Sequence, residues 1–223
     1  MLVYLWIAAF ATFPLFAATD GVQRQVRVSV ALDFEQKAFG ADVVRQMQIE
    51  AETILRDSGL GIEWTSIAES AQRQDLNEIL VFKMRGKCVM DSFPLLPDEL
   101  GLPLAFTHSI DGEILSFGAV DCDRVRSLLK RTMAGRDYAR GDFLFGRALG
   151  RVMAHEMVHM LARTSAHAED GVTRECLSAR ELSRDRLMLS DKSLRAIRGQ
   201  LALIKKKDGG SEDNAIPPMS SLP

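Results

Sequence analysis

The stretch His155-Glu156-Met157-Val158-His159 lies within a long apolar run, residues 143–162. Residues four apart on an α-helix share one face, so His155 and His159 can reach one point in space. Apolar residues form two stripes at helical spacing along this run: Ala148, Val152 and Ala162 in line with the two histidines, and Leu149, Met153, Met157 and Met160. A helix that is apolar on both sides is buried, and buried histidines need polar partners. A metal ion shared by both rings therefore explains the pair better than two histidines on a helix surface.

The spacing H-E-x-x-H is typical of zinc peptidases, in which the glutamate holds a water molecule rather than the metal. A catalytic zinc usually has three protein ligands, with water in the fourth position. His167 follows His159 by eight residues, and the weak helix formers Thr164 and Ser165 predict that the helix ends near residue 163. A turn after the helix can then present His167 to the metal. The open alternatives for this third ligand are Glu169, Asp170 and Glu181.

The segment 155–171, H-E-M-V-H-M-L-A-R-T-S-A-H-A-E-D-G, resembles a group of exported bacterial zincin-like proteins of the Acidobacteria type. Their pattern is H-E-x-x-H-x-L-L-G-x-x-x-H-x-x-x-G-[LI]-M. Arg163 stands where that family has Gly, and Val172-Thr173 stand where it has Leu or Ile followed by Met. The resemblance covers residues 120–189 well and the N-terminal half in outline. The positions that match are His155, Glu156, His159, Leu161, His167 and Gly171.

The resemblance implies a zincin fold and peptidase chemistry on peptide or protein substrates, as an endopeptidase rather than an exopeptidase. We expect His155, His159 and His167 to hold Zn²⁺, which lowers the pKa of a bound water to about 7. Glu156 would accept the proton of this zinc-bound water as it attacks the carbonyl carbon, and then pass it to the leaving amine. Converting Glu156 to Gln should keep the metal and abolish turnover.

Two other hypotheses remain open. The first is a catalytically inactive zincin-like protein that binds a metal or a partner, which the departures at Arg163 and Val172-Thr173 favour. The second is a purely structural helix with no metal. Metal content separates the second hypothesis from the others, and hydrolysis of a peptide library separates an enzyme from an inactive relative.

The first 18 residues form a continuous apolar run that ends in small residues before Thr19-Asp20. This pattern predicts a signal peptide, residues 1–18, with cleavage near Ala17 or Ala18, and therefore a secreted or periplasmic bacterial protein. The alternative is an uncleaved membrane anchor, which Pro14 and the short length disfavour. Residues 208–223 are rich in Gly, Ser and Pro and predict a disordered tail.

Between these segments, residues 22–207 have the length of one domain, which the family resemblance implies is a zincin-like metalloprotease domain. The net charge of −2 and the lack of a basic cluster interleaved with aromatic residues argue against a nucleic-acid partner. No pattern fixes the oligomeric state.

The periodicity of the chain predicts a mixture of strands and helices. The family resemblance implies that they form an α+β fold in which a mixed, zincin-like β-sheet packs on the central metal-binding helix, with C-terminal helices. Alternation of apolar residues predicts strands over 24–32, 62–67 and 79–84. Asp111-Gly112 predicts a hairpin over 104–120, which the family resemblance suggests is the edge that binds an extended peptide. Helices are expected over 40–58, 122–133, 177–189 and 192–206, with Asp142 as N-cap of the metal-binding helix and close packing at Gly150.

The remaining reactive side chains are few. His108 falls on the more apolar face of the hairpin and is expected to be an edge or core histidine rather than a ligand. The placement of Tyr138, as a second donor to an oxyanion, is left open. Cys88, Cys122 and Cys176 allow one internal disulfide, and we expect it between Cys88 and Cys122 because Cys176 lies beyond the metal loop.

Overall fold

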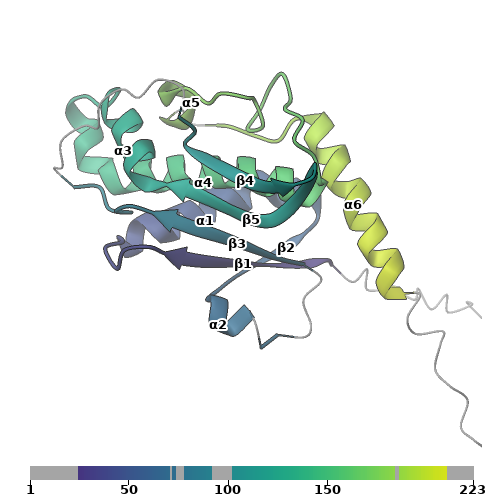
Figure 1. Cartoon of the computed structure of the whole chain (residues 1–223). Coiled ribbons are helices and arrows are strands. Elements are labelled where there is room, and N and C mark those ends of the chain that lie inside the picture. The colour runs from purple at the N-terminus through teal and green to yellow at the C-terminus, as the bar shows by residue number, and fades with distance from the viewer. Residues whose placement is uncertain (1–24, 71, 74–77, 92–101, 184–185, 210–223) are drawn as a thin grey trace, which may run out of the picture.

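A computed structural model describes residues 25–70, 72–73, 78–91, 102–183 and 186–209 of the chain (Figure 1). Its elements are a mixture of strands, α-helices and two short 3₁₀ helices. In chain order they are β1 (Arg27–Phe34), α1 (Ala41–Leu55), η1 (Arg56–Ser58), β2 (Gly61–Thr65), α2 (Ile67–Ser70), β3 (Glu78–Arg85), β4 (Ala105–Ile110), β5 (Glu113–Asp121), α3 (Cys122–Lys130), η2 (Gly135–Arg140), α4 (Gly141–Ala162), α5 (Ala179–Ser183) and α6 (Asp191–Gly209).

The strands form one mixed sheet in the order β2-β1-β3-β5-β4. The pairs β1–β2, β1–β3 and β3–β5 are parallel, whereas β4 runs antiparallel to β5 and forms one edge of the sheet. Asp111 and Gly112 turn the hairpin with φ of 51° and 82°, as a tight turn with two left-handed residues requires. The prediction of a mixed sheet with helices is confirmed, and so is the hairpin.

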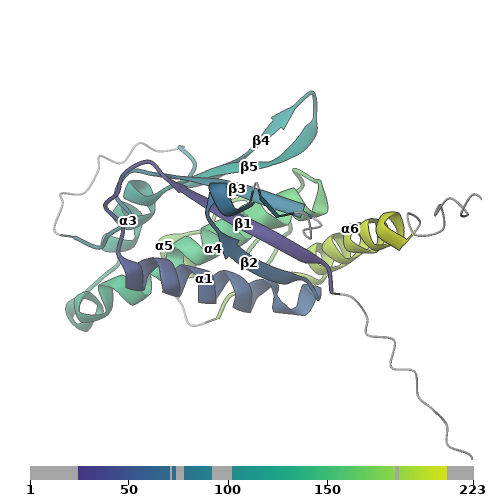
Figure 2. The same cartoon turned by 90° about the horizontal axis from the view of Figure 1, so that it is seen from below.

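Helix α4 packs against one face of the sheet, beside α1 (Figures 1 and 2). Two glycines on α4 let the helices approach closely: a Cβ at Gly146 would lie 2.5 Å from the Val43 carbonyl oxygen, and one at Gly150 would lie 2.6 Å from that of Met47. The expected close packing at Gly150 is therefore confirmed. Because α4 has the sheet on one side and α1 on the other, nearly all of its side chains are buried.

Several sequence-based boundaries were wrong. The strand predicted over 24–32 is Arg27–Phe34, the helix predicted over 122–133 ends at Lys130, and the helix predicted over 192–206 is Asp191–Gly209. The predicted strand 62–67 ends at Thr65, since Ser66 begins α2: its backbone N–H and hydroxyl both donate to the Glu69 carboxylate, at 2.9 Å each. The predicted helix 177–189 is only α5. Residues 186–190 have no helical structure, and the Met188 carbonyl oxygen accepts a hydrogen bond from the Val172 N–H.

Another error concerns the start of α4. Arg140 occupies the N-cap position and Asp142 lies inside the first turn, where its charge still favours the helix N-terminus. At the other end of the chain, α6 continues to Gly209, past the predicted domain boundary at 207. The predicted signal peptide and residues 210–223 lie outside the described residues. Among the helices that are described, none has the length and apolar character needed to cross a bilayer.

The predicted disulfide is present. Cys88, which follows β3, is bonded to Cys122, the first residue of α3, and Cys176 is free and exposed. The bridge closes a loop of 34 residues between β3 and α3. The bridge therefore ties the start of α3 to the end of β3.

Candidate metal centre

His155 and His159 lie one turn apart on the buried face of α4, and both rings are fixed by the backbone. The Nδ1 atom of His155 is 2.9 Å from the Val172 carbonyl oxygen, and that of His159 is 2.7 Å from the Thr164 carbonyl oxygen. A carbonyl oxygen only accepts, so each Nδ1 carries the ring proton and donates it. The Nε2 atom of each ring is then the one with a lone pair available to a metal, as is usual for metal-binding histidines.

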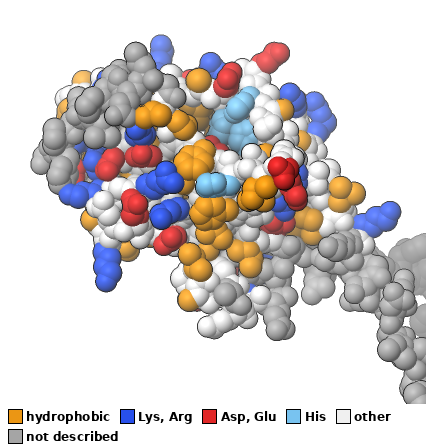
Figure 3. All heavy atoms as spheres, viewed as in Figure 1, with side chains coloured by type: hydrophobic (Ala, Val, Ile, Leu, Met, Phe, Trp, Pro, Cys, Tyr) orange, Lys and Arg blue, Asp and Glu red, His pale blue; other side chains and the backbone are white. Residues whose placement is uncertain are grey.

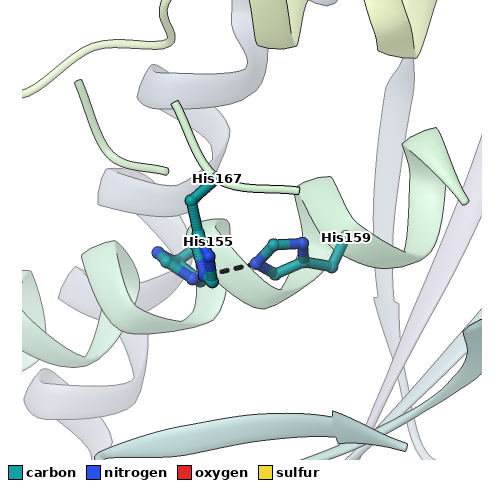
Figure 4. Close-up of side chains that lie close together, drawn as sticks. All are labelled: His155, His159 and His167. Carbon is teal, nitrogen blue, oxygen red and sulfur yellow. Dashed lines mark hydrogen bonds between the residues drawn. The ribbon is translucent and has the colours of Figure 1, made fainter. Parts of the chain in front are cut away.

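These two Nε2 atoms face each other at 3.0 Å (Figure 4). Two lone pairs at this distance repel unless a cation lies between them. A shared proton is one possibility, but burial lowers the pKa of His155 to about 4 and also lowers that of His159. Tetrahedral zinc bonds of 2.0–2.1 Å place two nitrogens about 3.3 Å apart. With a small outward movement of the rings, this pair can therefore hold a shared metal ion.

His167 completes the group from the loop after α4 (Figure 4). Its ring centroid lies 5.2 Å from that of His155 and 4.8 Å from that of His159. One ligand atom from each of the three residues lies within 4.8 Å of the others. Two buried histidines and one exposed histidine thus converge on a point that is open to solvent on one side.

The alternatives for the third ligand are placed elsewhere. Among the described residues, only the three histidines gather at metal-binding distance, so Glu169 and Asp170 are not part of the group. The Glu181 carboxylate is engaged at the start of α5, where it accepts from the Ser178 N–H at 3.0 Å and from the Arg174 guanidinium. Ser178 and Glu181 form a capping box, a local sequence signal that places Glu181 away from the metal.

The backbone of the loop 163–173 is built to hold the two helix histidines. The Thr164 N–H donates to the His159 carbonyl oxygen, and the Ala168 N–H donates to that of Thr173. Gly171 has φ of 72°, and a Cβ there would lie 2.6 Å from the Met188 carbonyl oxygen. Only glycine fits this position without strain. Gly171 therefore sets the course of the chain at Val172, whose carbonyl oxygen fixes His155.

Glu156 lies between α4 and the edge strand and is 6% exposed. Its Oε2 accepts a hydrogen bond of 2.7 Å from the Thr107 hydroxyl of β4. Burial raises the pKa of Glu156 from 4.5 to about 7, although the bond from Thr107 acts in the opposite direction. Its carboxyl group is thus poised to take up or release a proton near neutral pH.

A cleft of about 810 Å³ contains all four residues. One wall is the edge strand β4 with Ala105, Thr107 and Ser109, and the opposite wall includes Cys176 and Leu177. Figure 3 shows histidine side chains at the surface in this region, with hydrophobic side chains nearby. The cleft continues toward α3, where its lining includes Arg124, Ser127, Leu128 and Arg131.

The sequence predicted the place of His108 and left that of Tyr138 open. His108 contacts the rings of Phe106 and Phe117, at centroid distances of 5.0 and 4.8 Å, and does not line the cleft. It is an edge histidine, as predicted. Tyr138 lies on η2, is 61% exposed and does not line the cleft either, so it is not an oxyanion donor there. Thr107 was missed, because nothing local to residues 104–110 signals a bond to Glu156.

No known family model matches the sequence, and no curated protein sequence matches it. Among solved structures, archaemetzincin from Methanopyrus kandleri is similar to 80% of this chain and 96% of its own, with 10% sequence identity and a TM-score of 0.45. A likeness at this level does not by itself identify an activity. What the site can do follows from its geometry.

Proposed function

We propose that the chain is a zincin-like, zinc-dependent peptidase that hydrolyses peptide bonds in proteins or peptides. The observation that carries this proposal is the pair of Nε2 atoms of His155 and His159, 3.0 Å apart, with both Nδ1 atoms committed to backbone carbonyls. Such a pair is unfavourable in a buried helix unless a cation binds there. His167 supplies a third imidazole on the open side, which leaves one coordination position for water or substrate.

The three imidazoles are neutral nitrogen donors, which suit Zn²⁺. A bound zinc ion would supply a Lewis acid that polarises a carbonyl group and lowers the pKa of water. The protein's own contribution is to keep His155 and His159 neutral by burial and to fix their ring orientation through the Val172 and Thr164 carbonyls. Both features favour metal binding at neutral pH.

Glu156 is the proposed general base. Its carboxylate accepts a proton from the attacking water and returns it to the leaving amine, so it must work in both directions. In the metal-free chain, burial raises the pKa of Glu156 to about 7, and a bound Zn²⁺ would favour the carboxylate that the base needs.

The edge strand β4 is the proposed binding site for the substrate backbone. It pairs with β5 on one side only, and its other side forms a wall of the cleft that holds Glu156. An extended peptide could add to this edge as a further strand. The cleft extends from Leu102, before β4, along this strand to Ser109, and this length supports an endopeptidase rather than an exopeptidase. The apolar run 1–18 supports a secreted or periplasmic location.

Metal stoichiometry is the first test. The purified protein should bind about one zinc per chain, and a His167→Ala variant should bind it at least tenfold more weakly. Undiminished binding in the variant would remove His167 from the ligand set. No zinc in either protein would reject the metal centre and leave α4 as a structural helix.

Turnover is the second test. The zinc-bound protein should hydrolyse members of a broad peptide library, and a Glu156→Gln variant should keep its zinc and lose at least about 100-fold in rate. A protein that binds one zinc but cleaves nothing would instead be the inactive, partner-binding relative. Hydrolysis retained in Glu156→Gln would remove Glu156 from the reaction.

A further inference from the structure

The Thr107 hydroxyl links the edge strand β4 to the proposed base, Glu156. Its Oγ1 lies 2.7 Å from Glu156 Oε2 and 3.4 Å from the Glu156 carbonyl oxygen. A hydroxyl has one proton to donate, and the shorter contact has the length of a bond to a carboxylate. The hydroxyl therefore binds one carboxylate oxygen of Glu156 from across the cleft, at 49 residues' separation in the sequence.

The sheet is adapted to bring these two residues together. Gly118 of β5 pairs with Thr107, and a Cβ at Gly118 would lie 2.7 Å from Met160 Cε and 2.9 Å from the Phe106 carbonyl oxygen. Met160 lies one turn after Glu156 on α4. The missing side chain at Gly118 thus allows α4 to approach the sheet at the level of Thr107, close enough for a threonine hydroxyl to reach Glu156.

The pairing of β4 with β5 shifts immediately after Thr107. Thr107 pairs with Gly118 but Ser109 pairs with Ile114, so the two strands leave regular register between these points. Such irregularities bend a strand and redirect side chains, and they are frequent beside active sites. Here the shift lies next to the residue that contacts Glu156, and Ile114 and Ser109 both line the same cleft.

We propose that Thr107 is a positioning residue for the peptidase reaction: its hydroxyl fixes Oε2 of Glu156 and leaves Oε1 to accept the proton of water. This inference rests on the proposed function. In the described part of the chain no hydrogen bond to Oε1 is found, whereas Oε2 is held by Thr107. Since Thr107 belongs to the strand that would bind substrate, it also fixes the distance between the substrate backbone and the base.

The test compares Thr107→Val, which keeps the shape and removes the hydroxyl, with Thr107→Ser, which keeps the hydroxyl. Thr53→Val is the matched control, because Thr53 Oγ1 donates at 2.7 Å to the Ile49 carbonyl on an exposed face of α1. In the zinc-bound chain, Thr107→Val should lower kcat about 10- to 100-fold with KM and zinc content unchanged. Thr107→Ser and Thr53→Val should keep nearly the wild-type kcat.

A second measurement separates this inference from the proposed function. A dipeptide hydroxamate binds zinc and gives its proton to a neighbouring carboxylate, so its Kd reports the placement of Glu156 without turnover. Thr107→Val alone should weaken hydroxamate binding about tenfold. If the wild type binds zinc but hydrolyses no peptide, the proposed function fails, and the hydroxamate series still decides the role of Thr107. The inference would be overturned if all variants had the same kcat or the same Kd for the hydroxamate. It would also be overturned if Thr107→Val and Thr107→Ser lost activity or hydroxamate affinity to the same extent.

Discussion

Arg163 Nη2 lies 2.7 Å from the Glu78 carboxylate, so the residue that ends α4 is tied to the start of β3. Arg163 has φ of 49°, a left-handed conformation that favours glycine, and the zincin-like family that the sequence resembles has Gly at this position. Its guanidinium also donates to the Ile114 carbonyl oxygen and to Ser116 of β5. The arginine thus adopts the turn that glycine would make and adds a link from the metal loop to the sheet.

This arrangement predicts an order of stability among variants of Arg163. Arg163→Ala loses the contacts and keeps the left-handed strain, whereas Arg163→Gly loses the contacts and relieves the strain. We expect Arg163→Ala to be less stable than Arg163→Gly by about 1 kcal/mol, with the wild type at least as stable as the glycine variant. Urea unfolding measures the difference. Equal stability of the two variants would show that the conformation at 163 is not strained.

Gly171 provides a test of how the loop backbone fixes His155. A Cβ at this position would lie 2.6 Å from the Met188 carbonyl oxygen, so Gly171→Ala must displace the chain beside Val172. Since the Val172 carbonyl holds His155 Nδ1, we expect zinc affinity to fall about 10- to 100-fold. Gly112→Ala is the control: Gly112 also has positive φ, but its Cβ would meet nothing within 4 Å. Competition with a chromogenic chelator measures both, and unchanged affinity in Gly171→Ala would contradict the role given to Val172.

The histidine and glutamate positions could be predicted because they depend on local geometry. His155 and His159 lie on one face of a helix by their spacing alone, and the short segment to His167 limits where that ring can go. Thr107 could not be predicted, since its partner Glu156 lies on α4, 49 residues further along the chain, and the contact depends on how β4 pairs with Gly118. Long-range register is not visible in a single sequence.

Helix starts could likewise be read from local sequence signals, whereas helix ends could not. A helix is predicted over 177–189, but Ser178 and Glu181 begin a helix that ends at Ser183. The Ser-x-x-Glu pattern is a local signal for the start of this helix, and the same pattern at Ser66 and Glu69 marks α2. The end of α5 depends on tertiary structure, because the backbone at Met188 pairs with Val172 instead of continuing a helix.

Two glycine-to-alanine substitutions should have opposite effects on stability. Gly150 lies on α4 where a Cβ would meet the Met47 carbonyl oxygen at 2.6 Å, so Gly150→Ala must separate α1 from α4. We expect it to lower the free energy of unfolding by about 2–3 kcal/mol. Gly199 lies on α6 with nothing within 4 Å of a Cβ, and Gly199→Ala should raise it by about 0.5–1 kcal/mol through helix propensity. Thermal unfolding measures both, and a stabilising Gly150→Ala would show that the helices do not pack this closely.

The raised pKa of Glu156 predicts a pH-dependent stability in the metal-free protein. In the folded chain this pKa is about 7, and in the unfolded chain it returns to 4.5. Between these values the folded state holds a proton that the unfolded state has released, so stability falls as pH rises from 4.5 to 7. A shift of this size corresponds to about 3 kcal/mol. Gln at position 156 has no charge to bury and does not titrate.

We therefore expect Glu156→Gln to gain about 3 kcal/mol of stability relative to the wild type between pH 5 and pH 8, with EDTA present throughout. The pKa of His155 is lowered to about 4, so its contribution has the opposite pH dependence: it reduces stability as pH falls from 6.5 toward 4. That contribution is common to both proteins and cancels in the difference between them. Urea unfolding at pH 5, 6, 7 and 8 gives the two curves. Parallel curves would mean that Glu156 is already ionised at pH 5 in the folded protein. Burial would then not raise the pKa of Glu156 toward neutral pH.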